Sequence, residues 1–193
     1  MSLSVTPPSP TISGSNLPRF LLERRFLKPV LTGPRNARTC KFGRKDFESL
    51  RRDGERVWLL HCKAPKRRLK GTQALNYIED AERKHYDKRF LTRNRNPWYK
   101  PESREPAPIL FTYMTSGRPR FILNERRVLN LNNLHCLYLR QHVQKSSSRI
   151  AGLVRVLNSQ QVIEQLPQVG RVYGGGLVKV EPKELEMVLL PLC

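Results

Sequence analysis

Residues 109–123 read ILFTYMTSGRPRFIL, and this stretch predicts an antiparallel pair of strands. Its two apolar runs, Ile109–Tyr113 and Phe121–Leu123, consist of aliphatic and aromatic residues that favour strands. Between them, Ser116-Gly117-Arg118-Pro119 has the composition of a hairpin turn. Downstream, Leu131–Leu139 alternates in a pattern that indicates a third strand. These segments therefore predict a small sheet.

Helices are expected on both sides of this sheet in sequence. Thr72 can cap a helix that runs to about Arg83, and the run Ser146-Ser147-Ser148 can begin another that continues to about Asn158. Further predicted elements are a helix at 19–27, a strand at 57–62, a helix at 162–166 ended by Pro167, a short helix from Pro182 and a strand at 187–191. The chain is therefore predicted to be α+β, with a small mixed or antiparallel sheet and flanking helices.

The chain of 193 residues has the length of one domain, and its 38% hydrophobic content is enough for a core. Residues 1–18 are rich in Ser, Thr and Pro, and we expect them to be a disordered leader or linker. Residues 19–193 are expected to form the folded domain.

The charge of the chain is strongly positive, with a formal net value of +20. Residues 1–108 carry 25 of the 36 Lys and Arg residues, against 11 of the 16 acidic ones. This excess favours a polyanionic partner, and nucleic acid is the leading candidate. A membrane surface is less favoured, because the sequence has no long apolar run and no basic amphipathic helix.

Cysteine and histidine spacing argues against metal and disulfide chemistry. The four cysteines (Cys40, Cys62, Cys136 and Cys193) lack paired spacing, and residues 1–18 lack the apolar segment of a secretory signal. We therefore expect free thiols in a cytoplasm. The histidines follow no metal-ligand or hydrolase pattern, so no metal site and no independent hydrolase activity are expected.

Residues 83–100 form the most cationic segment, and aromatic side chains are interleaved with its charges. Cations can hold phosphates while flat rings stack or wedge, so this mixture is typical of a nucleic-acid surface. The predicted contacts are Lys88, Arg89, Arg93, Arg95 and Lys100. Trp98 and Tyr99 are interpreted more readily as core anchors than as DNA contacts.

A second candidate is the segment YGGGLVK at 173–179. Three glycines remove every side chain at one point, so another surface can approach the peptide groups closely. The aromatic Tyr173, the bare amides of Gly174 and Gly175, and the cation of Lys179 suit a sugar–phosphate backbone or an extruded base. The alternative is a flexible turn.

Base-reading candidates lie between these two segments. Arg118 and Arg120 can reach base edges or phosphates from the predicted hairpin. Asn130, Asn132 and Asn133 can pair with adenine, but asparagine equally builds turns; a structural role is favoured for most of them, with Asn132 and Asn133 as the candidates near DNA.

Four short motifs occur in a fixed order: RNPWYK at 95–100, PRFILN at 119–124, NLNNLH at 130–135 and the glycine segment. In this order they resemble the C-terminal specificity region of TaqI-like, gamma-type adenine-N6 DNA methyltransferases, including enzymes of type II restriction–modification systems. The resemblance covers about residues 17–191. It implies a target-recognition domain that binds duplex DNA beside a methyltransferase catalytic domain or subunit, in a prokaryotic cytoplasm at the nucleoid.

The catalytic motifs of such enzymes are missing from the sequence. It contains no Asn-Pro-Pro-Tyr-like loop for the target base and no Asp/Glu-x-x-x-Gly-x-Gly loop for S-adenosylmethionine. We therefore expect no catalytic residues and no cofactor in this chain, with S-adenosylmethionine on a separate catalytic core. The chain is then a fragment or subunit of a site-specific methyltransferase. An RNA- or ribosome-associated basic structural protein is the alternative that charge alone allows.

Overall fold

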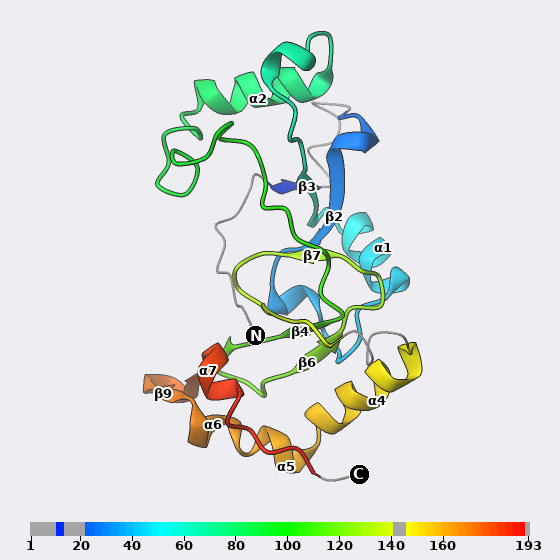
Figure 1. The fold of residues 1–193 in the computed structure, drawn as a ribbon, viewed down its shortest axis with the longest axis vertical. Helices are drawn as coiled ribbons and strands as arrows, with labels where there is room; N and C mark the ends of the chain where they lie inside the picture. The colour runs from blue at the N-terminus through cyan, green and yellow to red at the C-terminus, as the bar shows by residue number, and fades with distance from the viewer. Residues whose placement is uncertain (1–10, 14–21, 141–145, 192–193) are drawn as a thin grey trace.

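The computed structural model describes residues 11–13, 22–140 and 146–191. These residues form an elongated molecule in which short helices and three small sheets follow one another along the long axis (Figure 1). This arrangement confirms the predicted α+β class. Among the described residues, no helix combines the length and the apolar character needed to cross a membrane.

The three sheets differ in their place along the molecule. The first has the order β1-β3-β2-β7, formed by Thr11–Ser13, Arg56–Leu60, Leu27–Leu31 and Leu129–Asn130; only its β2–β7 pair is parallel. The second is antiparallel, with the order β6-β4-β8 formed by Phe121–Leu123, Ile109–Phe111 and His135–Leu137. The third is antiparallel, with the order β5-β10-β9 formed by Met114–Thr115, Leu177–Lys179 and Arg171–Tyr173.

The helices surround these sheets. They are α1 (Arg44–Arg52), α2 (Gln73–Arg83), α4 (Ser147–Leu157), α5 (Gln160–Ile163), α6 (Leu166–Val169) and α7 (Pro182–Leu185), with 3-10 turns at Arg24–Phe26, Pro34–Asn36, Lys66–Arg68 and Gly174–Gly176. The Thr72 hydroxyl accepts a 3.2 Å hydrogen bond from the Leu75 N–H, and the Ser146 hydroxyl accepts one of 3.3 Å from the Arg149 N–H. Both predicted helix starts are therefore confirmed.

The second sheet separates two hydrophobic cores. Leu110 and Ile122 are paired across β4 and β6, and both belong to the core that lies against α1 and α2. Their neighbours Ile109, Phe111 and Phe121 point the other way, into the core beneath α4, α5 and α6. Side chains alternate between the faces of a strand, and both faces are covered here, which explains the continuous apolar run that predicts the sheet.

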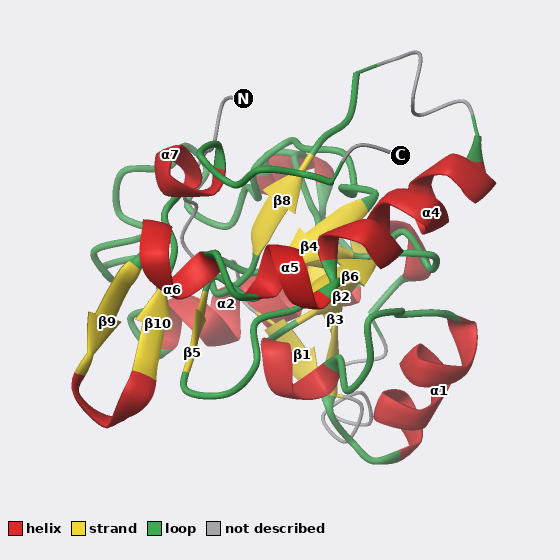
Figure 2. Ribbon diagram, turned by 90° about the horizontal axis from the view of Figure 1, so that it is seen from below, coloured by secondary structure: helices red, strands yellow, loops and turns green. Residues whose placement is uncertain are grey.

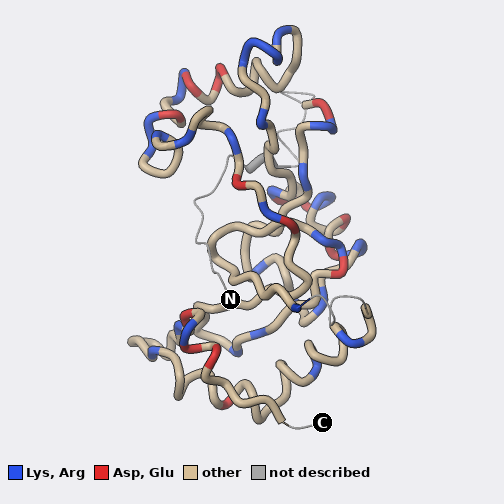
Figure 3. Tube along the Cα trace, in the orientation of Figure 1, with Lys and Arg blue, Asp and Glu red and all other residues tan. Residues whose placement is uncertain are grey.

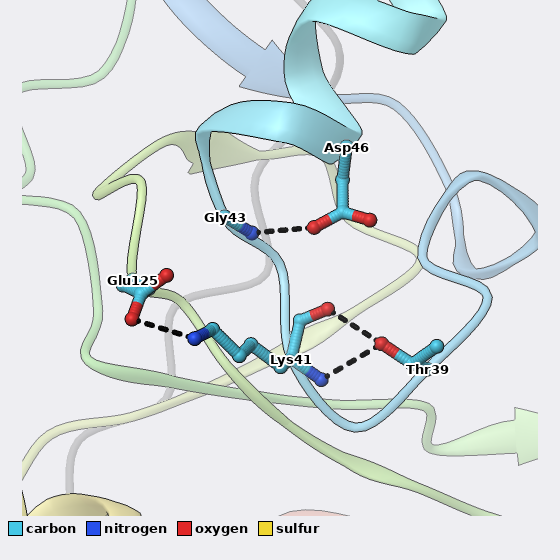
Figure 4. A network of polar contacts seen from close by, with 5 residues as sticks. All are labelled: Thr39, Lys41, Gly43, Asp46 and Glu125. Carbon is cyan, nitrogen blue, oxygen red and sulfur yellow. Dashed lines mark hydrogen bonds and ion pairs between the residues drawn. The ribbon is translucent and has the colours of Figure 1, made fainter.

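A polar network joins the start of α1 to the chain after β6 (Figure 4). The Asp46 carboxylate accepts a 2.8 Å hydrogen bond from the Gly43 N–H, which caps the first turn of α1. The Lys41 ammonium lies 2.9 Å from the Glu125 carboxylate, and the Thr39 hydroxyl donates to the Lys41 carbonyl. The segment that leads into α1 is thereby held against the chain that follows β6.

Three predicted elements are wrong in type or extent. The sequence predicts one helix at 19–27, but among the described residues only 24–26 form a turn, and Leu27 begins β2, where pairing with β3 overrides local preference. The predicted strand 131–139 is limited to β8, because residues 131–134 form a turn held by the Asn130 side chain. The expected strand at 187–191 is absent; Gln165 instead makes two hydrogen bonds to the Leu189 backbone.

Two connections also differ from the prediction. β4 and β6 pair as expected, but residues 112–120 include β5, which pairs with β10 instead of completing a tight hairpin. The predicted helix at 162–166 is two short helices, and Pro167 lies in the first turn of α6, where its missing N–H costs nothing. Helix α1 was not predicted, because only Phe47 and Leu50 of its side chains are buried.

The predicted leader is described only in part. Thr11–Ser13 form β1 and pair with β3, so this piece belongs to the first sheet. Residues 1–10 and 14–18 lie outside the described residues.

Candidate nucleic-acid interface

The segment that follows α2, residues 84–100, is called the cationic loop below. Its backbone makes successive turns around the buried side chain of Thr92. The Thr92 hydroxyl donates towards the Tyr86 carbonyl and lies 3.2 Å from the Arg89 carbonyl. The Thr92 N–H donates to the same Arg89 carbonyl at 3.0 Å. These contacts hold the loop in one conformation around a buried hydroxyl.

Three predicted phosphate contacts lie exposed on the cationic loop: Lys88, Arg89 and Arg93. Within the part of the chain that the structure describes, none of the three is in an ion pair. The Arg89 guanidinium stacks on Tyr86 at 3.7 Å from the ring centroid, and the Arg93 guanidinium lies 5.1 Å from that of Phe90. Their charges are therefore available to an anionic partner.

The other cations near this loop differ in their surroundings. Arg83 and Lys84 both contact the Asp80 carboxylate, at 3.2 and 2.6 Å, so part of their charge is compensated. Arg95 is half-buried and has an intrachain interaction, whereas Lys100 is exposed. Figure 3 shows several Lys and Arg positions at the end of the molecule that carries α2, with Asp and Glu positions among them.

The two aromatic residues of the RNPWYK motif anchor the loop. The Trp98 indole N–H donates a 2.7 Å hydrogen bond to Glu82, and the buried Tyr99 hydroxyl donates one of 2.7 Å to the Ala64 carbonyl. Their rings meet edge to face with centroids 5.7 Å apart. The anchoring interpretation of both residues is therefore confirmed.

The glycine segment connects β9 to β10 in an antiparallel ribbon, called the glycine hairpin below (residues 171–179). Gly175 and Gly176 have φ angles of +72° and +71°, which L side chains rarely adopt. A Cβ added at Gly174, Gly175 or Gly176 would meet nothing within 4 Å, so their peptide groups face open space. Figure 2 shows the hairpin extending from the body of the molecule.

The side chains of the glycine hairpin differ in whether they face solvent or are paired with a neighbouring acidic residue. Tyr173 is 44% exposed and faces solvent beside the glycines. Lys179 lies 2.6 Å from the Glu181 carboxylate; this hydrogen bond raises the pKa of Lys179 and lowers that of Glu181. Arg171 is 3.3 Å from Glu184. The positive charges of the hairpin are therefore partly compensated by its own acidic neighbours.

The candidates between the two segments divide into exposed and internally bonded side chains. Arg118 is exposed and makes one 3.3 Å hydrogen bond to the Asn158 carbonyl. Arg120 is half-buried and donates to the Arg38 and Pro34 carbonyls, at 2.9 and 3.2 Å. Its guanidinium therefore joins two distant segments of the chain.

The asparagines divide in the same way. Asn132 and Asn133 are exposed, but the Asn133 amide donates a 2.7 Å hydrogen bond to the Thr32 carbonyl. Asn130 is buried and donates to the Leu131 and Leu134 carbonyls. The structural interpretation is therefore confirmed for Asn130, and Asn132 is the most available of the three.

The cationic loop and the glycine hairpin lie on the same side of the molecule, on the left in Figure 1, but near opposite ends of its long axis. The second sheet lies between them. The structure therefore places the two predicted segments in separate regions of one side.

Sequence reasoning missed two exposed side chains of the cationic loop. Phe90 is 70% exposed and Leu91 is 39% exposed. The available signal was an aromatic–aliphatic pair inside a run of cations, with no periodic partner to form a core face.

The described residues contain no group of three or more His, Cys, Asp or Glu side chains that could hold a metal ion. Gly174–Gly176 join two antiparallel strands at an exposed tip. Cys40, Cys62 and Cys136 are free thiols.

Comparison with known proteins agrees with the resemblance seen in the sequence. Residues 11–193 match the family described as "Type II methyltransferase M.Eco57I, C-terminal domain". The type II methyltransferase M.AccI of Acinetobacter calcoaceticus is 31% identical over 175 residues, which are 91% of this chain and 32% of that protein. The type II methyltransferase M.XamI of Xanthomonas campestris pv. amaranthicola is 36% identical over 105 residues, 54% of this chain and 19% of the relative.

The chain thus spans about a third or less of the length of these relatives. The matched family covers nearly all of it, including the cationic loop and the glycine hairpin. The protein belongs to the family of C-terminal domains of type II restriction–modification methyltransferases.

Proposed function

We propose that this chain binds duplex DNA as the target-recognition part of an adenine-N6 DNA methyltransferase or restriction–modification enzyme. The observation that carries the proposal is the cationic loop. Lys88, Arg89 and Arg93 stand without ion pairs among the described residues, on a backbone fixed by Thr92. Cations carried on an ordered backbone can neutralise phosphates without the cost of ordering the loop first.

Each region of the proposed interface has its own role. Lys88, Arg89, Arg93, Arg95 and Lys100 contact phosphates and set the register of the domain on the duplex. Arg118 and Asn132 reach towards base edges, because both are exposed on the segment between the two regions. Arg120 and Asn133 support that segment through their bonds to backbone carbonyls.

The glycine hairpin contacts the DNA backbone near the adenine that leaves the helix. The open space at Gly174 and Gly175 permits close approach of a phosphate to their peptide groups. Tyr173 offers an aromatic ring beside these glycines. The Glu181 carboxylate holds the Lys179 ammonium in position through their ion pair. These residues support the base that the catalytic partner modifies.

The chemistry itself belongs to a partner in this proposal. S-adenosylmethionine and the base-binding loop reside on a separate catalytic domain or subunit, in the part of the relatives that this chain does not span. The chain supplies sequence recognition and no catalytic group. Action on chromosomal DNA places the assembly at the nucleoid of a prokaryotic cell.

A salt titration of binding to duplex DNA and to a matched structured RNA tests the proposal. For roughly five to eight phosphate contacts, log affinity for duplex DNA should fall against log salt with a slope of about −4 to −7. One duplex sequence selected from a random library should retain binding longest as salt rises. Equal or tighter RNA binding, without sequence dependence at any salt, contradicts the proposal and favours an RNA-associated basic protein.

Matched variants locate the phosphate contacts. Lys88→Ala and Arg93→Ala should each make the slope shallower by about one, because each removes one phosphate contact. Arg51→Ala is the control: Arg51 is exposed on α1, and its guanidinium lies 3.1 Å from Glu48. An equal change in all three variants would mean that the charge is read only as a bulk property.

A further inference from the structure

Phe90 and Leu91 expose large apolar side chains in the middle of the cationic loop. Phe90 is 70% exposed and Leu91 is 39% exposed, although both residue types are usually buried. Neither belongs to any of the three hydrophobic clusters of the described residues. Their exposure therefore has no explanation in the packing of this chain.

The loop presents these two side chains on a fixed backbone. Phe90 and Leu91 lie between Arg89 and the buried Thr92. The Arg89 carbonyl accepts hydrogen bonds from Thr92 and from the Arg93 N–H, so the backbone on both sides of the pair is held. The Tyr86 N–H donates to the Ala81 carbonyl at 3.0 Å, which ties the start of the loop to the end of α2. An apolar pair held in this way loses little entropy when it inserts into a partner.

Cations surround the apolar pair. Lys88 and Arg89 precede it, and Arg93 follows with its guanidinium 5.1 Å from the Phe90 ring centroid. Asp87 is the acidic residue of this stretch, and it is half-buried. The stretch is positively charged overall, so a polyanion complements it better than a protein surface of mixed charge does. An exposed aromatic side chain with cations on both sides can stack against DNA bases while the cations contact the phosphates of the two strands.

We propose that Phe90 is a wedge that inserts at a base-pair step of duplex DNA from the minor groove, with Leu91 beside it, and kinks the duplex there. Lys88, Arg89 and Arg93 hold the phosphates that flank the opened step. The wedge rests on the proposed function, since it requires that the chain bind duplex DNA. It adds that binding deforms the DNA at the cationic loop, where no base needs to be read by hydrogen bonds.

The test compares the 193-residue chain with Phe90→Ala, Phe90→Leu and Leu189→Ala. The probe is a duplex selected by the unmodified chain from a random-sequence library, carrying fluorophores at its two ends to report bending. Phe90→Ala should lower affinity about tenfold, as expected for the loss of one base–aromatic stack, and should abolish most of the bend. Its slope of log affinity against log salt should stay unchanged, because no phosphate contact is removed.

The other two variants show whether the effect belongs to an apolar side chain at position 90. Phe90→Leu keeps an apolar wedge and should retain most of the bend, and Leu189→Ala removes a side chain that is 76% exposed elsewhere and should change neither affinity nor bend. Phe90 lies outside the hydrophobic clusters, so the thermal midpoint of every variant should match the parent. A Phe90→Ala protein that binds and bends the duplex like the parent overturns the wedge. So does a parent that binds without bending, while failure of the parent to bind any duplex refutes the proposed function instead.

Discussion

The side-chain amide of Asn158 and the backbone of Phe121 form a reciprocal pair of hydrogen bonds. The Asn158 Nδ2 donates to the Phe121 carbonyl at 2.8 Å, and the Phe121 N–H donates to the Asn158 Oδ1 at 3.1 Å. Phe121 lies in β6, the edge strand of the second sheet, and Asn158 caps the end of α4. The Asn158 amide therefore pairs the outward N–H and carbonyl of Phe121, while Leu123 on the same edge pairs with the backbone of Cys40 and Phe42.

Asn158→Ala should destabilise the fold by about 1–3 kcal/mol, because it leaves the N–H and the carbonyl of Phe121 without partners. Urea unfolding of the parent and the variant measures the difference. Asn76→Ala is the matched control, since Asn76 is exposed on α2 and should change stability by no more than about 0.5 kcal/mol. Equal effects of the two substitutions would mean that the amide pair contributes nothing specific.

Arg120 and Arg118 are expected to separate stability from DNA binding. Arg120→Ala removes the hydrogen bonds to Pro34 and Arg38, so it should cost about 2 kcal/mol of stability and leave the salt slope of DNA binding unchanged. Arg118→Ala should change stability by no more than about 0.5 kcal/mol and reduce affinity for the selected duplex. A slope that becomes shallower by about one in Arg120→Ala would assign Arg120 to a phosphate instead.

The glycine hairpin offers a comparison between neighbouring residues. Gly174→Ala adds a methyl group to open space, and only Gly175 and Gly176 of the triplet have positive φ, so the fold should be unaffected. The same methyl group should weaken DNA binding if a phosphate approaches the peptide closely. Gly175→Ala adds backbone strain of about 1–2 kcal/mol, which Gly175→Asn should partly relieve. Titration with the selected duplex and thermal melting separate the two effects; unchanged DNA binding by Gly174→Ala would leave the glycines as a turn alone.

His135 should make stability depend on pH. Its ring stacks on Tyr113 with centroids 3.9 Å apart, and burial holds its pKa below the ordinary 6.5, with Glu181 opposing and Lys179 adding to the shift. The unfolded chain then takes up a proton more readily than the folded one. Stability is therefore complete above the unfolded pKa of about 6.5 and falls as the pH drops below it. His61 has a pKa lowered by burial and by Lys63, so it acts in the same direction.

His135→Phe keeps a ring against Tyr113 and removes the titration. The free energy of unfolding of this variant should fall less than that of the parent over the same pH interval. Its absolute stability is not the readout, because the substitution also changes packing. A pH dependence identical to that of the parent would assign the effect to groups other than His135.

Much of this protein follows from local sequence. The hydroxyls of Thr72 and Ser146 cap α2 and α4 where the sequence predicts, because a cap depends on groups only three residues apart. The apolar runs of β3, β4 and β6 predict strands, since their residues favour an extended and buried backbone. Order and spacing of four motifs were sufficient to indicate the methyltransferase family.

The tertiary structure decided which segments meet. Met114 and Thr115 pair with β10 rather than closing a hairpin, and Leu27 joins β3 rather than ending a helix. Such partners are distant in the chain, so their pairing depends on how the two cores assemble and not on local preference. The charged α1 escaped prediction for a related reason: it is held by two buried side chains and a cap.

The tertiary structure also sorted the candidate site. Arg120 and Lys88 are equally cationic in the sequence, yet one is bonded to backbone carbonyls from residues 34 and 38 and the other is exposed. Residue type determines the charge that a position carries, and with it the preference of the whole chain for a polyanion. Whether that charge faces an internal carbonyl or solvent depends on neighbours brought together by folding, and this physical difference separates Arg120, which is bonded inside the chain, from Lys88, which is exposed.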